Sequence, residues 1–175
     1  TAVGGGILRD SIISRFPSAL FDPSSIYLAI FVAIIMYIFV VLNRSNYGYN
    51  SETYRWLREA YLIFDSIGLI IFSLIGPTVL IETKLNLMSA GLLACLTGAG
   101  GGIIRDLLIN EVPSVLKEDI YALLSFAVGL SYYGLTHFIG FSRISTFIII
   151  FILGFIIRMI IIRFRLSLPN MENRG

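Results

Sequence analysis

Long apolar runs separated by short polar segments fill most of the chain. The runs that are long enough for a membrane helix, or nearly so, are residues 26–42, 61–81, 85–109, 120–136 and 141–162. A transmembrane helix needs about 20 mostly apolar residues, because the hydrocarbon core of a bilayer is about 30 Å thick. Residues 4–16 have the pattern of the second half of a broken helix. The alternation predicts an all-α membrane protein.

The run at 85–109 contains residues that are unfavourable in a membrane helix. Its sequence from 98 to 106 is Gly-Ala-Gly-Gly-Gly-Ile-Ile-Arg-Asp. Glycine inside a helix costs up to about 1 kcal/mol relative to alanine. A charged side chain at membrane depth costs about 2.5–3.5 kcal/mol on insertion scales. A glycine cluster next to an Arg-Asp pair therefore needs a functional or packing reason.

The same motif occurs a second time, near the start of the chain. Residues 3–10 read Val-Gly-Gly-Gly-Ile-Leu-Arg-Asp, and in both copies a Pro-Ser pair follows, then an Ile-Tyr pair that opens the next apolar run. These pairs are Pro17-Ser18 and Pro113-Ser114, and Ile26-Tyr27 and Ile120-Tyr121. Two copies in register over this length indicate an internal duplication.

The duplication predicts an inverted architecture. Each unit has three helices, an odd number, so the second unit must enter the membrane in the opposite orientation. The second copy has a long helix and half of another before its glycines, whereas the first has neither. We therefore expect roughly 30–40 further residues upstream, which would give seven transmembrane helices. We assign residues 1–59 to the remainder of repeat 1, 60–140 to repeat 2, and 141–175 to the seventh helix and a polar tail.

Basic residues in the loops predict the orientation in the membrane. On one face they are Arg44, Arg55, Arg58, Lys117, Arg163, Arg165 and Arg174, and on the other Arg15, Lys84 and Arg143. Cytoplasmic loops carry the excess of lysine and arginine. We expect a multi-pass protein of the cell membrane, with its C-terminus in the cytoplasm and its N-terminus outside.

The composition narrows the classes of function. Hydrophobic residues make up 57% of the chain and charged residues 14%, against roughly 25% charged in soluble domains. The net charge of +2 is too small to indicate nucleic acid binding. The single cysteine, Cys95, excludes an internal disulfide and a cysteine-based metal site. No Ser/His/Asp or metal-ligand constellation is present, so we expect neither an enzyme nor a bound metal or cofactor.

The repeated motif has the chemistry of a small-solute site. Inverted repeats with broken helices often bind an ion or solute near the middle of the membrane. Carbonyls freed by a break attract cations, and freed amides attract anions. Arg9-Asp10 and Arg105-Asp106 follow the two glycine runs. Since neighbouring helical residues point about 100° apart, we expect pairing across the pseudo-two-fold axis, Arg9 with Asp106 and Arg105 with Asp10, or with carbonyls of the other break.

Each of these features also has a purely structural interpretation. The glycines could be packing residues where two helices cross closely. The two Arg-Asp pairs could be structural clamps, and Asp65, inside the run at 61–81, could cap a helix or pair within the bundle. Gly129 and Gly134 also predict close helix packing.

The motifs resemble those of a known family. The duplicated Gly-Gly-Gly-x-x-Arg-Asp, the later proline, and Asp65-Ser66-Ile67-Gly68-Leu69 are similar to the prokaryotic relatives of the trimeric intracellular cation (TRIC) channels, whose bacterial domain is also labelled a glycine transporter. The resemblance implies two inverted three-helix repeats plus a seventh helix. It further implies a homotrimer in the lipid bilayer, with a potassium-permeable pore in each protomer lined by two glycine-broken helices. Carried over by position, the hinge residues are Gly4, Gly5, Gly6, Gly100, Gly101 and Gly102. The charged pore residues are Arg9, Asp10, Asp65, Arg105 and Asp106.

These observations favour a cation-selective channel that conducts K⁺, with Na⁺ as a second permeant ion. The cation would be held transiently near carbonyls of the glycine breaks. The alternative is a secondary transporter for a small amino acid such as glycine, in which Asp106 would bind the amine. A third hypothesis is a structural or regulatory membrane subunit. Unitary currents mark a channel, whereas saturation and coupled stoichiometry mark a transporter.

Overall fold

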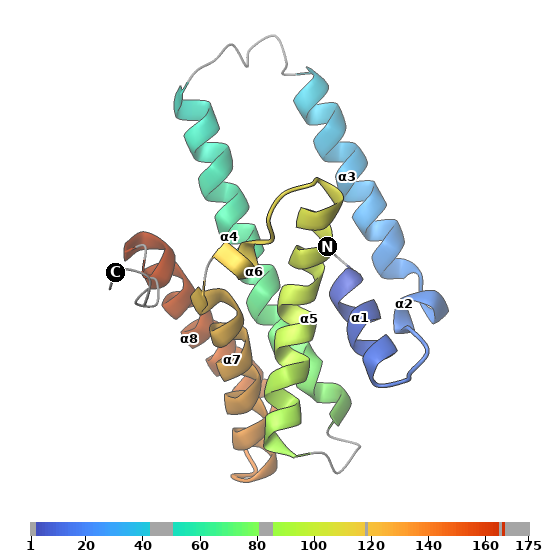
Figure 1. The fold of residues 1–175 in the computed structure, drawn as a ribbon, viewed down its shortest axis with the longest axis vertical. Helices are drawn as coiled ribbons and strands as arrows, with labels where there is room; N and C mark the ends of the chain where they lie inside the picture. Colours follow the sequence, from blue (N-terminus) through green and yellow to red (C-terminus); the bar gives the residue numbers. More distant parts are fainter. Residues whose placement is uncertain (1–2, 43–50, 81–85, 118, 165, 167–175) are drawn as a thin grey trace, which may run out of the picture.

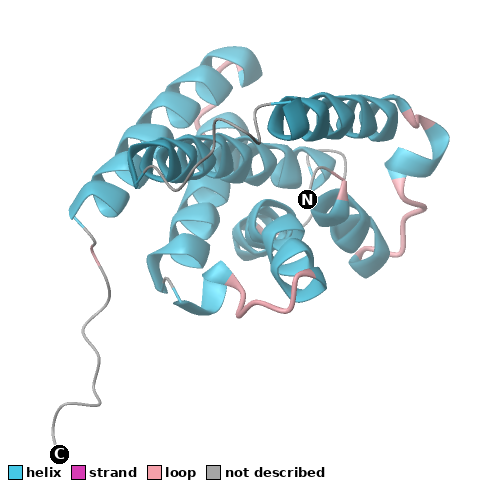
Figure 2. Cartoon of the chain, turned by 90° about the horizontal axis from the view of Figure 1, so that it is seen from above, coloured by secondary structure: helices cyan, strands magenta, loops and turns pink. Residues whose placement is uncertain are grey.

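The computed structural model of the protein describes residues 3–42, 51–80, 86–117, 119–164 and 166. In this part of the chain helices are joined by short loops, and no strand is present (Figure 2). In chain order the elements are α1 (Gly4–Ile12), α2 (Ser18–Phe21), α3 (Ser24–Leu42), α4 (Ser51–Ile75), the 3₁₀ helix η1 (Gly76–Leu80), α5 (Leu87–Leu108), α6 (Ser114–Lys117), α7 (Asp119–His137) and α8 (Arg143–Phe164). All five apolar runs are helical, as predicted.

Several of these helices suit a membrane. Arg58–Val79, Leu87–Leu108 and Arg143–Phe164 are long and apolar enough to cross one, and Ser24–Phe39 is a shorter apolar helix. Almost every described residue of α3 is exposed, and most are Ile, Phe, Val or Leu. A surface of this composition is suited to contact with lipid or another apolar surface. The protein is an all-α membrane protein.

The fourth helix begins earlier than the apolar pattern predicts. The predicted start was residue 61, but α4 begins at Ser51. Arg55 and Glu59 form an exposed ion pair of 3.7 Å one turn apart, which is compatible with a helix that continues beyond its apolar part. The predicted boundary between the two repeats, at 59–60, therefore lies inside α4. Of the residues used for the orientation, Arg44, Lys84, Arg165 and Arg174 lie outside the described residues.

Helix α5 lies at the centre of the bundle (Figure 1). It packs against α1, α4 and α7. Of its membrane-length window 56% is buried, compared with 28% for α8. The motif at 98–106 is therefore held on three sides by other helices.

The prediction of a glycine-broken helix is wrong for the second copy, because α5 continues from Leu87 to Leu108 through its glycine run. In the first copy the glycines form the first turn of α1, which begins at Gly4, and a break before them stays a prediction. The glycines instead let the helices approach each other closely. A Cβ atom on Gly5 would lie 2.1 Å from the Thr97 carbonyl oxygen and 3.3 Å from the Gly101 nitrogen. The glycines act here as packing residues, because the absence of a Cβ atom lets α1 and α5 approach each other. Both glycine runs keep helical backbone geometry.

The two copies of the motif face each other antiparallel. The missing Cβ of Gly4 is 3.0 Å from Ile104 Cδ1, and that of Gly100 is 3.0 Å from Leu8 Cδ1. These are reciprocal contacts between equivalent positions. Figure 1 shows α1 and α5 running in opposite directions, as the inverted repeat predicts.

The ends of the two motif helices also share their local geometry. Ser14 and Asn110, 96 positions apart, both have positive φ, 54° and 58°. Just after them, the Arg15 and Glu111 N–H groups donate to the Asp10 and Asp106 carbonyls, both at 2.8 Å. A residue in the left-handed region is a common way to end a helix. The duplication seen in the sequence is therefore also present in the backbone.

Helices α4, α7 and α8 enclose the main apolar core. Its buried residues are Ile70, Leu74, Leu124, Val128, Tyr132, Ile150 and Ile161. Close packing is confirmed at Gly129, where a Cβ would lie 2.2 Å from the Cβ of Ala94 on α5. The prediction of close packing is wrong for Gly134, where no atom of a neighbouring element lies within 4 Å of the position that a Cβ would occupy. Helix α7 therefore approaches α5 through Gly129.

Candidate functional site

Two cavities lie along α5, and each contains one of the motif arginines. The Arg105 cavity, of about 270 Å³, lies among α4, α5 and α7, and its walls include Tyr61, Asp65, Phe72, Gly102, Arg105 and Tyr121. The Arg9 cavity, of about 250 Å³, is bordered by α1, α2 and the start of α3, and its walls include Gly6, Arg9, Asp22, Ser25, Phe72 and Thr97. Phe72 belongs to both.

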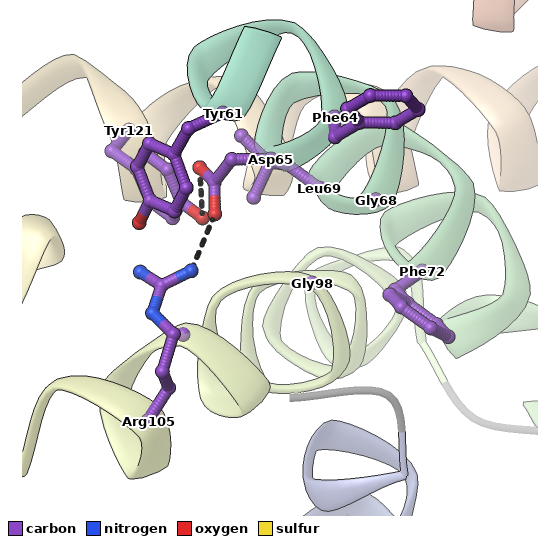
Figure 3. Close-up of a pocket in the computed structure, with 10 residues that line it drawn as sticks. Tyr61, Phe64, Asp65, Gly68, Leu69, Phe72, Gly98, Arg105 and Tyr121 are labelled. Carbon is purple, nitrogen blue, oxygen red and sulfur yellow. Dashed lines mark hydrogen bonds and ion pairs between the residues drawn. The ribbon is translucent and has the colours of Figure 1, made fainter. Parts of the chain in front are cut away.

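The guanidinium of Arg105 contacts two carboxylates, those of Asp106 and Asp65, and Figure 3 shows the contact with Asp65. Its Nε donates to Asp106 Oδ1 at 2.8 Å, and its Nη2 lies 2.8 Å from the same oxygen. Its Nη1 donates to Asp65 Oδ1 at 3.0 Å. The interpretation of Asp65 as a residue that pairs within the bundle is confirmed. One guanidinium with two carboxylates leaves a formal charge of −1.

Two tyrosines complete the surroundings of this cluster. The Tyr121 hydroxyl donates to Asp65 Oδ2 at 3.2 Å, so both oxygens of that carboxylate are hydrogen-bonded. The guanidinium carbon of Arg105 lies 5.1 Å from the centre of the Tyr61 ring, within the range of a cation–π contact. On its other side Tyr121 meets Arg158, whose guanidinium carbon is 4.7 Å from the ring centre.

Arg9 has one carboxylate partner. Its Nε donates to Asp10 Oδ1 at 2.8 Å, and its Nη2 lies 2.7 Å from the same oxygen. The other oxygen, Asp10 Oδ2, accepts the Ser18 backbone N–H at 3.0 Å. Asp10 therefore joins the charged end of α1 to the first residue of α2. The Arg9–Asp10 pair is formally neutral.

The predicted pairing across the pseudo-two-fold axis is wrong. Each arginine binds the aspartate that follows it in its own copy. The guanidinium is on a long side chain that reaches the next residue in spite of the 100° between them. In addition, Arg9 and Arg105 both lie in the last turn of their helices. Because α1 and α5 are antiparallel, the two last turns lie toward opposite ends of the helix pair.

A further carboxylate borders the Arg9 cavity. Asp22, in the loop between α2 and α3, is exposed, and its Oδ1 accepts the Ser24 backbone N–H at 3.1 Å. Hydrogen bonds from the Ser24 side chain and backbone hold the pKa of the Asp22 carboxyl below its usual value. Asp22 is therefore negatively charged at neutral pH.

The structure divides the predicted site residues into three groups. Those that border a cavity are Gly6, Arg9, Asp65, Gly102 and Arg105. Those at the crossing of α1 and α5 are Gly4, Gly5, Gly100 and Gly101. The remaining two, Asp10 and Asp106, are buried and hold the arginines.

Sequence reasoning missed four side chains of this region. Phe72, Tyr61 and Tyr121 stand in apolar runs, where an aromatic residue has no distinctive pattern. Arg158 had a signal that could have been used, because it is a charged residue within the apolar part of the run at 141–162. Within the described residues no group of three or more His, Cys, Asp or Glu could hold a metal ion.

Comparisons with known proteins define the class. The protein-family model described as "Glycine transporter" matches residues 1–42 and 62–137. The UPF0126 membrane protein YvgT of Bacillus subtilis (strain 168) is 30% identical over 99% of this chain and 80% of its own length. The UPF0126 inner membrane protein YadS of Escherichia coli (strain K12) is 27% identical over 97% of this chain and 78% of its own length.

Solved structures agree with these matches. A structure titled as a prokaryotic TRIC channel in 0.5 M KCl superposes with a TM-score of 0.77 at 28% identity, over 94% of this chain and 78% of that one. The TRIC orthologue from Rhodobacter sphaeroides gives 0.77 at 27% identity, over 94% and 79%. The chain belongs to this family of prokaryotic, TRIC-like membrane proteins.

Proposed function

We propose that the protein is a potassium-permeable cation channel, with a conduction path in each protomer. The observation that carries the proposal is the pair of cavities that share Phe72 and lie beside two antiparallel helices. Since Arg105 and Arg9 lie toward opposite ends of this helix pair, the two cavities together form the two halves of a path along α5.

The residues at which the two cavities adjoin are uncharged. Phe72 lines both cavities, while Gly98 borders one and Thr97 the other. A hydrophobic constriction in a pore can close a channel by excluding water. We therefore assign to Phe72 the separation between the two halves of the path.

The charges of the path favour cations. The Arg105 cluster carries −1 with Asp65 and Asp106, the Arg9–Asp10 pair is neutral, and Asp22 adds a negative charge beside the Arg9 cavity. Rings or clusters of carboxylates are a usual source of cation selectivity. Carboxylates replace the free carbonyls of a broken helix as the attracting groups, because both glycine runs remain helical.

The structural neighbours support the same function. Their titles name them as a prokaryotic TRIC channel in 0.5 M KCl and a TRIC trimeric intracellular cation channel orthologue. By the same analogy we propose a homotrimer of this chain in the bilayer. The family model is described as "Glycine transporter", so glycine uptake is the alternative function that the test must distinguish.

The test is a flux assay on the full chain in liposomes. K⁺-loaded vesicles should lose K⁺ down its gradient, and the rate should keep rising with K⁺ concentration where the rate of a carrier would saturate. Labelled glycine should not accumulate in the vesicles. Asp65→Asn should reduce the K⁺ flux in the same vesicles, whereas Asp65→Glu should retain most of it. Saturable glycine uptake without K⁺ leak would contradict the channel proposal.

A further inference from the structure

Helix α8 carries one buried charged side chain, Arg158, in its second half. Arg158 is only 1% exposed, although the helix around it is almost wholly apolar. A buried arginine at membrane depth is costly and is often connected with function. It borders neither the Arg105 cavity nor the Arg9 cavity among the residues that define them. Any effect on the path must therefore pass through another residue.

Tyr121 connects Arg158 to the path. The guanidinium of Arg158 lies over the Tyr121 ring at 4.7 Å from its centre, and the ring is 97% removed from solvent, with 3% exposed. A cation over an aromatic face holds the ring by its quadrupole, more strongly when both are desolvated. The orientation of the ring then determines where the Tyr121 hydroxyl points.

That hydroxyl has one partner in the path, the carboxylate of Asp65. Tyr121 Oη donates to Asp65 Oδ2 at 3.2 Å, and Arg105 Nη1 donates to Asp65 Oδ1 at 3.0 Å (Figure 3). The carboxylate therefore divides its two oxygens between a neutral and a charged donor. Without the tyrosine, both oxygens are available to the guanidinium of Arg105, which also binds Asp106.

The backbone is arranged for such coupling. Helix α8 packs against α4, which carries Asp65, and against α7, which carries Tyr121. One turn before Arg158, a Cβ on Gly154 would lie 3.2 Å from Val128 and 3.3 Å from Ile70. This close packing holds α8 firmly against α4 and α7, which carry Asp65 and Tyr121.

We propose that Arg158 is a positioning residue: through the Tyr121 ring and the Asp65 carboxylate it determines how Arg105 is held in the conduction path. Its consequence for ion flow rests on the proposed channel function. Loss of the Arg158 guanidinium frees the Tyr121 ring, so that Asp65 binds Arg105 with both oxygens and is less available to a passing cation. Conductance then falls.

The test compares five variants of the full chain in planar bilayers: Arg158→Met, Arg158→Lys, Tyr121→Phe, Arg158→Met with Tyr121→Phe, and Arg163→Gln. Arg158→Met and Tyr121→Phe should each lower the unitary K⁺ conductance, by roughly threefold or more if the coupling has the usual size for contacting residues. The unitary conductance of the double variant should be no lower than that of the less conductive single variant. Arg163→Gln removes an exposed arginine from the same helix and should leave conductance unchanged.

If the effects of Arg158→Met and Tyr121→Phe multiply in the double variant, the two residues act independently and the proposal is overturned. Should Arg158→Met not fold, Arg158→Lys replaces it in the same cycle. Lysine keeps a cation near the ring but not the planar guanidinium, so a smaller loss of conductance is expected.

A second readout separates this proposal from the channel function. In ¹⁵N-arginine NMR spectra of the micelle-bound protein, the Arg105 side-chain signal, assigned with Arg105→Gln, should shift in both Arg158→Met and Tyr121→Phe. If the wild-type protein is silent in bilayers but this shift occurs, the channel function fails and the positioning role of Arg158 stands. If the protein conducts and the Arg105 signal does not move, the positioning role fails.

Discussion

Arg9 and Arg105 occupy the same position of a repeated motif, yet their electrostatic surroundings differ. Among the described residues Arg9 pairs with the carboxylate of Asp10, whereas Arg105 pairs with those of Asp106 and Asp65. Asp65 comes from α4, a different helix, and receives a second hydrogen bond from Tyr121. The two halves of the path are thus symmetric in backbone but differ in where the negative charge lies: in the Arg105 half it belongs to the buried cluster, and in the Arg9 half it comes from the exposed Asp22.

This asymmetry predicts the effect of Asp65→Asn. A carboxylate about 4 Å from a monovalent cation contributes up to about 4 kcal/mol at an effective dielectric constant of 20, most of it offset here by Arg105. The substitution changes the cluster from −1 to neutral, so we expect the ratio of K⁺ to Cl⁻ permeability to fall on the order of threefold. The measurement is the reversal potential under a KCl gradient. An unchanged reversal potential would show that Asp65 does not contribute to selectivity, and Asp65→Glu is the charge-conserving control.

Phe72 allows a second test at the level of one side chain. Truncation by Phe72→Ala removes the ring that borders both cavities. The open path becomes wider and wetter, so unitary conductance should rise, on the order of twofold, and closures should become shorter. Phe64→Ala is the matched control, because Phe64 borders only the Arg105 cavity. If the two truncations change the single-channel conductance equally, Phe72 does not separate the two halves of the path.

Among the elements, the crossing of α1 and α5 determines the geometry of the path. The two helices meet through glycines in reciprocal contacts, Gly4 with Ile104 and Gly100 with Leu8. Because α1 and α5 are antiparallel, their charged last turns lie toward opposite ends of the pair, and one cavity lies beside each. The glycines therefore allow the close approach of α1 and α5, and their role as hinges stays a prediction.

The crossing predicts different results for two neighbouring glycines. Gly5→Ala places a methyl group 2.1 Å from the Thr97 carbonyl oxygen, and backbone must move. We expect a loss of about 1–3 kcal/mol in stability. Gly6→Ala has no atom within 4 Å of the new methyl and should be neutral or slightly stabilising, since alanine is favoured in helices by about 1 kcal/mol. Thermal unfolding in detergent measures both, and equal melting temperatures would contradict the close approach.

At the scale of the whole molecule, the inverted arrangement leaves the orientation in the membrane to be determined. We propose that the C-terminus is cytoplasmic, because basic residues concentrate on that face of the sequence. A green fluorescent protein fused to the C-terminus should then fluoresce in cells, whereas an alkaline phosphatase fusion at the same point should be inactive. An active phosphatase would place the C-terminus outside and reverse the direction of the path.

Much of this architecture could be predicted because it is written in long, regular patterns. Apolar runs predict the helices, and the copies at 3–10 and 98–106 predict the antiparallel pair and the charged residues at its ends. The state of the glycines could not be predicted, since the same residue serves both a broken helix and a close crossing.

The partners of the charged residues could also not be predicted from the sequence. The contact of Asp65 with Arg105 joins residues 40 positions apart, and that with Tyr121 joins residues 56 apart. Such contacts depend on which faces of α4, α5 and α7 meet, and a period of apolar residues gives little information when a helix is apolar on most sides. Arg158 is different, because a charged residue within an apolar run is visible in the sequence, although its partner Tyr121 is not.

The central claim is that cations pass between the Arg105 and Arg9 cavities. Single-channel recording of the purified full chain in a planar bilayer under a KCl gradient tests it most directly, with Phe72→Ala recorded beside the wild type. We predict discrete current steps that reverse close to the K⁺ equilibrium potential, and larger steps for Phe72→Ala. A bilayer that stays silent with folded protein inserted, or steps that reverse at the Cl⁻ potential, would contradict the account.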